Sequence, residues 1–171
     1  SGFVSFTPAP GYLENEDYVS EFSSTPFSPA PFLNPSRPKS RFVDDNFDAS
    51  LVANEIFELM LGKKMPDIAI NVLPAFQFQM VHSAFGRWNE GILGFSINGP
   101  SKAIFLKESQ LDELLLVLGH EIGHLVSDQL PNKHDEEAKA FAFSMEWAST
   151  IKKHNIMGLA ANISEKPNLN P

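Results

Sequence analysis

The chain has 171 residues, with 13 basic against 21 acidic side chains and a net charge of −8. The length favours one domain with a modest core, and the acidic balance argues against a nucleic-acid-binding surface. Because cysteine is absent, disulfides, thiolate metal sites and cysteine proteases are excluded. No signal peptide or membrane-spanning run is visible, so we expect no membrane partner and favour a cytoplasmic location.

Residues 1–43 differ in composition from the rest of the chain. They hold seven of the thirteen prolines and eight aromatic residues, and they sustain neither a helical nor a strand period. Proline-rich polar sequence is typical of a flexible linker, but solvated linkers rarely contain so many aromatic side chains. We interpret residues 1–43 as an extended arm over the following domain, with a linker as the alternative.

The next segments predict a helix and a strand. A helix is expected to begin at Asn46 or Asp48 and to end at Gly62, a typical helix stop. Five apolar residues of this stretch share one helical face: Leu51, Val52, Ile56, Leu59 and Met60. Residues 68–73 are rich in β-branched residues and bounded by prolines, which predicts a strand.

A hairpin is predicted further along the chain. Residues 91–97 and 102–106 are two strand-like runs joined by Asn-Gly-Pro-Ser, a typical turn sequence. Residues 75–90 are ambiguous, because their apolar residues fit either a helix or a strand.

The most informative stretch is residues 116–126, L-V-L-G-H-E-I-G-H-L-V, which contains the pattern H-E-x-x-H. In a helix, His120 and His124 lie one turn apart on one face and can reach one ion, while Glu121 projects beside it as a general base for water. Ser109 and Asp112 suggest the N-terminal cap of this helix. The alternative is a buried helix with two hydrogen-bonded histidines. The predicted H-E-x-x-H helix also contains Gly119 and Gly123, whose small size would allow either a ligand or another secondary-structure element to approach the helix closely.

Two histidines do not complete a catalytic zinc site, so a third ligand is expected downstream. The extended metzincin pattern is excluded because Ser127 and Leu130 replace its glycine and third histidine. After a chain reversal, Asn132 or Asp135 is expected to cap a second helix that runs to about Met157. An antiparallel return would place a first-turn carboxylate opposite His124.

The sequence H-E-I-G-H followed by E-E-A-K-A-F-A-F resembles the gluzincin metallopeptidases, especially the minigluzincins and the ImmA/IrrE-type proteases, over about residues 90–150. The resemblance implies an α+β fold, in which a small mixed sheet with a hairpin packs on the H-E-x-x-H helix. A second, antiparallel helix would carry the third ligand. It also implies a Zn²⁺ ion held by His120, His124 and Glu137. Glu136 competes for that place, since only one of the two glutamates can face the metal. Lys139 departs from the ImmA/IrrE pattern, which has asparagine there.

The resemblance further implies a zinc-dependent peptidase acting on peptides or proteins, with Glu121 as general base. In that superfamily, peptides typically bind as an added strand along a sheet edge. His134 is the nearest candidate to steady the oxyanion. The expected organisation is an arm (1–43), a metallopeptidase domain (44–158) and a C-terminal tail (159–171). We hypothesise that the arm covers part of the active-site groove and keeps the enzyme latent. The alternative function is a non-catalytic metal-binding or regulatory interaction module.

Overall fold

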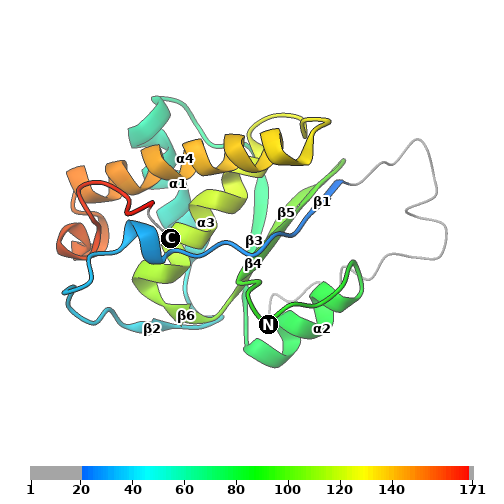
Figure 1. Ribbon diagram of the computed structural model, residues 1–171, viewed down its shortest axis with the longest axis horizontal. Coiled ribbons are helices and arrows are strands. Elements are labelled where there is room, and N and C mark those ends of the chain that lie inside the picture. The colour runs from blue at the N-terminus through cyan, green and yellow to red at the C-terminus, as the bar shows by residue number, and fades with distance from the viewer. Residues whose placement is uncertain (1–20, 170–171) are drawn as a thin grey trace.

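The computed structural model describes residues 21–169, which fold into helices packed around a small mixed sheet (Figure 1). The α-helices are α1 (Ala49–Leu61), α2 (Ala75–Ser83), α3 (Leu111–Leu125) and α4 (Lys133–Lys153). The strands are β1 (Glu21–Ser23), β2 (Phe42–Val43), β3 (Ile68–Leu73), β4 (Gly94–Asn98), β5 (Lys102–Lys107) and β6 (Ser109–Gln110). Short 3₁₀ turns are η2 (Ala30–Phe32), η3 (Ile156–Gly158) and η4 (Ala160–Asn162). The predicted α+β class is confirmed.

The main sheet has the strand order β1-β4-β5-β3. Strands β4 and β5 form the predicted antiparallel hairpin, and β5 pairs in parallel with β3, the predicted strand. Strand β1 is antiparallel to β4 and forms one edge of the sheet. Strands β2 and β6 form a separate two-stranded sheet. The sheet edge beside β4 is therefore occupied by a segment from the N-terminal part of the same chain.

Helices cover both faces of the main sheet (Figure 1). On β5, Ile104 and Leu106 join the larger core cluster, which includes residues of α1, α3 and α4, whereas Ala103 and Phe105 join a smaller cluster with α2. This alternation follows from the period of two in a strand. The ambiguous stretch 75–90 is resolved as helix α2 followed by a loop. Within residues 21–169, no helix combines the length and the apolar character needed to cross a bilayer.

The described part of the N-terminal arm packs into the larger core. Phe32 is 1% exposed, and Phe27, Leu33 and Val43 belong to the same cluster. The predicted tail packs there as well, because Leu33 forms a β-bridge with Ile163. Residues 27–43 and 159–163 therefore contribute to one core with residues 44–158. Residues 1–20 of the predicted arm lie outside the described part.

The helix ends confirm some predictions and correct others. Asp48 caps α1 by accepting a hydrogen bond from the Leu51 N–H group, and Gly62 follows in the left-handed conformation at φ 68°. Asn132 caps α4 in the same way. The predicted end of the second helix near Met157 is wrong, because α4 ends at Lys153 and 3₁₀ turns follow.

The predicted cap of the H-E-x-x-H helix is also wrong. Ser109 lies in β6 beside Val43, and α3 begins at Leu111. The first helical N–H groups bond to the N-terminal segment instead: Leu111 N donates to the Arg41 carbonyl at 2.8 Å and Asp112 N to the Ser40 hydroxyl at 3.1 Å. Residues about 70 positions away therefore cap this helix.

Helices α3 and α4 pack closely and run antiparallel, as predicted. Gly123 lies against Ala140, and Gly119, one turn earlier, lies against Trp147, further along α4. A Cβ atom at Gly119 would lie 2.3 Å from Cδ1 of Trp147, and one at Gly123 would lie 2.9 Å from the Ala140 Cα. The Trp147 indole N–H donates to the Leu115 carbonyl at 2.9 Å. The two glycines therefore serve helix packing, which sets the rotation of α4 relative to the histidines.

Candidate metal centre

Helix α3 brings His120 and His124 together on one face, as the H-E-x-x-H spacing predicts. Both residues are buried. Their ring centroids lie 4.8 Å apart with the planes at 88°, and their Nε2 atoms are 3.3 Å apart. The two imidazoles therefore present neighbouring nitrogens to one point, the arrangement that binding of a single ion requires.

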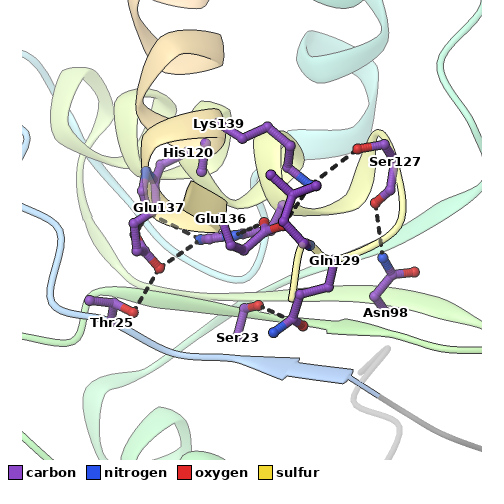
Figure 2. Close-up of polar contacts among 12 residues, drawn as sticks. Ser23, Thr25, Asn98, His120, Ser127, Gln129, Glu136, Glu137 and Lys139 are labelled. Carbon is purple, nitrogen blue, oxygen red and sulfur yellow. Dashed lines mark hydrogen bonds and ion pairs between the residues drawn. The ribbon is translucent and has the colours of Figure 1, made fainter. Parts of the chain in front are cut away.

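Glu137, in the second turn of α4, completes this cluster. Its Oε2 atom lies 3.2 Å from His120 Nε2, and its Oε1 atom lies 3.3 Å from His124 Nε2. One ligand atom from each of the three residues lies within 4.8 Å of the other two. Figure 2 shows Glu137, on the neighbouring helix, beside His120. The structure thus brings together the three residues predicted as metal ligands.

Glu136, the competing glutamate, lies on the other side of His124. Its Oε2 atom is 2.6 Å from His124 Nδ1, and its Oε1 accepts hydrogen bonds from the Leu130 N–H and the Lys139 ammonium, each at 2.8 Å. A carboxylate at Nδ1 keeps the proton on that nitrogen and leaves Nε2 available to an ion. Glu136 therefore orients His124, a candidate ligand, and Lys139 holds Glu136 in turn (Figure 2).

The charges of the cluster reinforce this division of roles. Burial lowers the pKa of His124, but contacts with Glu137, Glu121 and Glu136 outweigh it and raise the pKa to about 9. Burial raises the pKa of Glu137, yet hydrogen bonds from His120, His124 and Thr25 bring it far below the usual range of a carboxyl. At neutral pH, the metal-free cluster therefore pairs a protonated His124 with an ionised Glu137.

Glu121 occupies a different environment from the other two glutamates. It is 2% exposed, and within the described part of the chain its Oε1 atom has no hydrogen-bond partner. Burial raises the pKa of its carboxyl, although the neighbouring His120 and His124 oppose that change. A carboxylate with a raised pKa beside two candidate metal ligands has the properties of a general base.

Two residues of the N-terminal segment contact the cluster and were not predicted. The Thr25 hydroxyl donates to Glu137 Oε1 at 2.8 Å. The Phe27 ring stacks on the His120 ring, with centroids 4.1 Å apart and planes at 14°. No motif marks either residue, and each lies more than 90 positions from the residue that it contacts. Only the path of the chain across the site reveals them.

His134, the candidate oxyanion residue, is not brought to the cluster. It lies in the first turn of α4 with its side chain 92% exposed, and its Nδ1 atom is 4.0 Å from the Asp135 carboxylate. At this position on the helix its side chain faces solvent, whereas Glu136 and Glu137 turn toward α3.

The cluster fits a zinc ion in its dimensions and in its donor atoms. Two ligands held by one tetrahedral zinc at about 2.05 Å lie about 3.3 Å apart, and the observed separations are 3.2 to 3.3 Å. Two imidazoles and one carboxylate are also the donor set of catalytic zinc sites.

Comparison of the chain with protein-family models, curated proteins and solved structures gave no match.

Proposed function

We propose that this protein is a zinc-dependent peptidase of the gluzincin type that hydrolyses peptide bonds in peptides or proteins. The observation that carries the proposal is the set of three ligand atoms from His120, His124 and Glu137, with the buried Glu121 carboxylate in the same helical turn. Three protein ligands leave the fourth position of a tetrahedral zinc open, which distinguishes a catalytic site from a structural one.

A zinc ion held by these residues would supply Lewis acidity, making a water molecule more acidic and polarising a carbonyl group. The residues of the chain do the rest. Glu121 takes a proton from the attacking water and delivers it to the leaving amine. Its carboxyl lies in the same helical turn as the two histidines and is buried, so it is placed to carry the proton between the water and the amine. Glu136 keeps the His124 imidazole in the tautomer that presents Nε2 to the ion.

The donor set supports zinc over magnesium or calcium. Magnesium and calcium favour oxygen ligands in octahedral or larger coordination shells, whereas two of the three donors here are imidazole nitrogens. Irving–Williams preferences would also permit copper or nickel, so metal identity is part of the test.

The test combines metal content with hydrolysis. Full-length protein is purified, its metal is quantified by mass spectrometry, and cleavage of an unfolded protein and of a peptide library is followed. The Glu121→Gln variant should keep about one zinc per chain and lose at least about a hundredfold in rate, a typical contribution of general acid–base catalysis. His124→Ala should lose the metal. Glu146→Gln, an exposed change on α4, is the matched control and should alter neither.

Two outcomes would contradict the proposal. If Glu121→Gln lost zinc as completely as His124→Ala, the assigned roles would be wrong. If zinc bound but neither the wild-type chain nor the Phe22→Ala variant described below cleaved any substrate, the alternative of a non-catalytic metal-binding module would replace the peptidase.

A further inference from the structure

The chain passes the metal centre as an extended segment, residues 22–25. In β1, Phe22 lies opposite Ile97 and Ser23 opposite Ser96 of β4. The side chains then alternate: Phe22 and Ser24 contact His82 of α2, whereas Ser23 and Thr25 contact Gln129 and Glu137 on the metal side. Figure 2 shows Thr25 of this segment directed at Glu137, and Ser23 directed at Gln129. A peptide in this register thus meets both the sheet edge and a metal ligand.

The Phe22 side chain occupies an aromatic pocket, formed by His82, Phe85, Phe95 and Gly86. Its ring centroid lies 5.4 to 5.6 Å from the rings of His82, Phe85 and Phe95. Gly86 completes the wall, since a Cβ atom there would lie 2.8 Å from Phe22 Cε1. Gly86 does not have a positive φ, so its lack of a side chain matters for space and not for backbone conformation. The pocket is therefore shaped to admit an aromatic ring.

Residues 22–25 are less deeply buried than Phe27, Phe32 and Leu33, which follow them. All four are half-buried, and their side chains are fixed by Phe22 in the pocket and by the hydroxyl contacts of Ser23, Ser24 and Thr25. From Phe27 onward the segment enters the main core. Displacement of residues 22–25 leaves the larger core cluster intact, although it removes Phe22 from the edge of the smaller cluster. It also frees the edge of β4, whose backbone groups can then pair with another strand.

We propose that the aromatic pocket and the β4 edge form a peptide-binding subsite, which residues 22–25 of the resting chain occupy in place of substrate. The ligand class is an extended peptide with an aromatic side chain three residues before the residue that lies against Glu137. The resting protein is then blocked by its own chain, and a substrate binds by displacing it. The hydrolytic part of this inference rests on the proposed peptidase function, whereas the subsite does not.

Peptide binding tests the subsite directly. The probe is a fluorescent peptide with the sequence of residues 21–27, E-F-S-S-T-P-F, compared with a version that has alanine at its second position. Both are titrated by anisotropy into zinc-loaded full-length protein. Phe22→Ala empties the pocket, so this variant should bind the phenylalanine peptide at least about tenfold more tightly than the wild type does. The same variant should also bind the phenylalanine peptide at least about tenfold more tightly than the alanine peptide.

A second variant separates release of the chain from the shape of the pocket. Adding Gly86→Ala to Phe22→Ala leaves the chain free but narrows the pocket, so the preference for the phenylalanine peptide should disappear. Ser24→Ala removes the hydroxyl that contacts His82. It should also raise the affinity for the phenylalanine peptide above that of the wild type, but by less than Phe22→Ala does. If Phe22→Ala and Ser24→Ala both bound the two peptides equally, or bound neither, the subsite would be refuted.

Hydrolysis by the same variants distinguishes the two proposals. With both correct, Phe22→Ala cleaves aromatic peptides about tenfold or more faster than the wild type. Aromatic-selective binding without cleavage by any variant would keep the subsite and overturn the peptidase. Equal cleavage by wild type and Phe22→Ala, together with no selective binding, would keep the peptidase and overturn the subsite.

Discussion

Zinc binding should release about one proton per ion at pH 7, and this proton comes from His124. In the metal-free cluster, His124 has a carboxylate at each ring nitrogen: Glu136 lies 2.6 Å from Nδ1 and Glu137 lies 3.3 Å from Nε2. These contacts outweigh burial and raise the pKa of the imidazole to about 9. The ion needs the Nε2 lone pair, so it must replace the proton on that nitrogen.

The size of the effect on zinc affinity follows from the difference between the pKa of His124 and the pH of the measurement. At pH 7 the imidazole is about two units below its pKa, and removing its proton costs about 2.7 kcal/mol. The contribution of His124 to the apparent zinc affinity should therefore rise about tenfold per pH unit from pH 7 and level off near pH 9. Glu137 adds no proton, because its pKa lies far below neutrality.

Isothermal titration in buffers of different ionisation enthalpy measures this release. The matched variant is Glu136→Gln, which keeps the shape but removes one of the carboxylates that raise the pKa of His124. In this variant, the number of protons released on zinc binding should begin to fall at a lower pH than in the wild type. A release near zero for the wild type at pH 7, or a zinc affinity independent of pH between 7 and 9, would refute the assignment of His124 as a charged ligand precursor.

Two further predictions concern stability. Gly119→Ala should gain about 1 kcal/mol in helix propensity but lose more by overpacking against the buried Trp147. For a net loss of about 2 kcal/mol in the free energy of unfolding, the melting temperature should fall by about 4–8 °C. An unchanged melting temperature would show that the indole moves aside. Burial lowers the pKa of His82 below its ordinary value of 6.5, so the unfolded chain binds more protons just below that pH and stability falls as the pH drops through it. Urea unfolding of the zinc-free proteins should show that His82→Gln loses less stability than the wild type as the pH falls from 6.5 to about 5.5, a range in which the contribution of His124 is nearly constant; equal losses would contradict this.

Local patterns predicted the elements that depend on local physics. The α1 helix follows from its apolar stripe and its Asp48 cap, and β3 follows from a β-branched run between prolines. His120 and His124 meet because four residues span about one turn. In each case the determining groups lie within a few positions of one another, so the sequence contains the whole cause.

The features that local spacing left open or predicted wrongly depend on contacts between distant segments. Glu137 is expected as the third ligand from the family resemblance, not from spacing. Glu136 and Glu137 point about 100° apart on any helix, and the choice between them depends on how α4 is rotated. That rotation is set where Ala140 and Trp147 meet the two glycines of α3. The Ser109 cap failed for the same reason, because residues of the N-terminal segment satisfy the first N–H groups of α3.

The N-terminal segment therefore combines two roles that a truncation would not separate. Arg41 and Ser40 cap the helix that carries the histidines, Pro38 accepts a hydrogen bond from Asn162, and Phe32 lies in the main core. Losing such contacts removes a cap worth about 1 kcal/mol and a buried aromatic side chain worth about 3–5 kcal/mol, a large share of the stability of a small domain. Deleting residues 1–43 would then test folding and not latency. Latency has to be tested at Phe22, where the side chain is half-buried at the edge of the smaller core cluster and its removal leaves the larger core cluster and the helix cap in place.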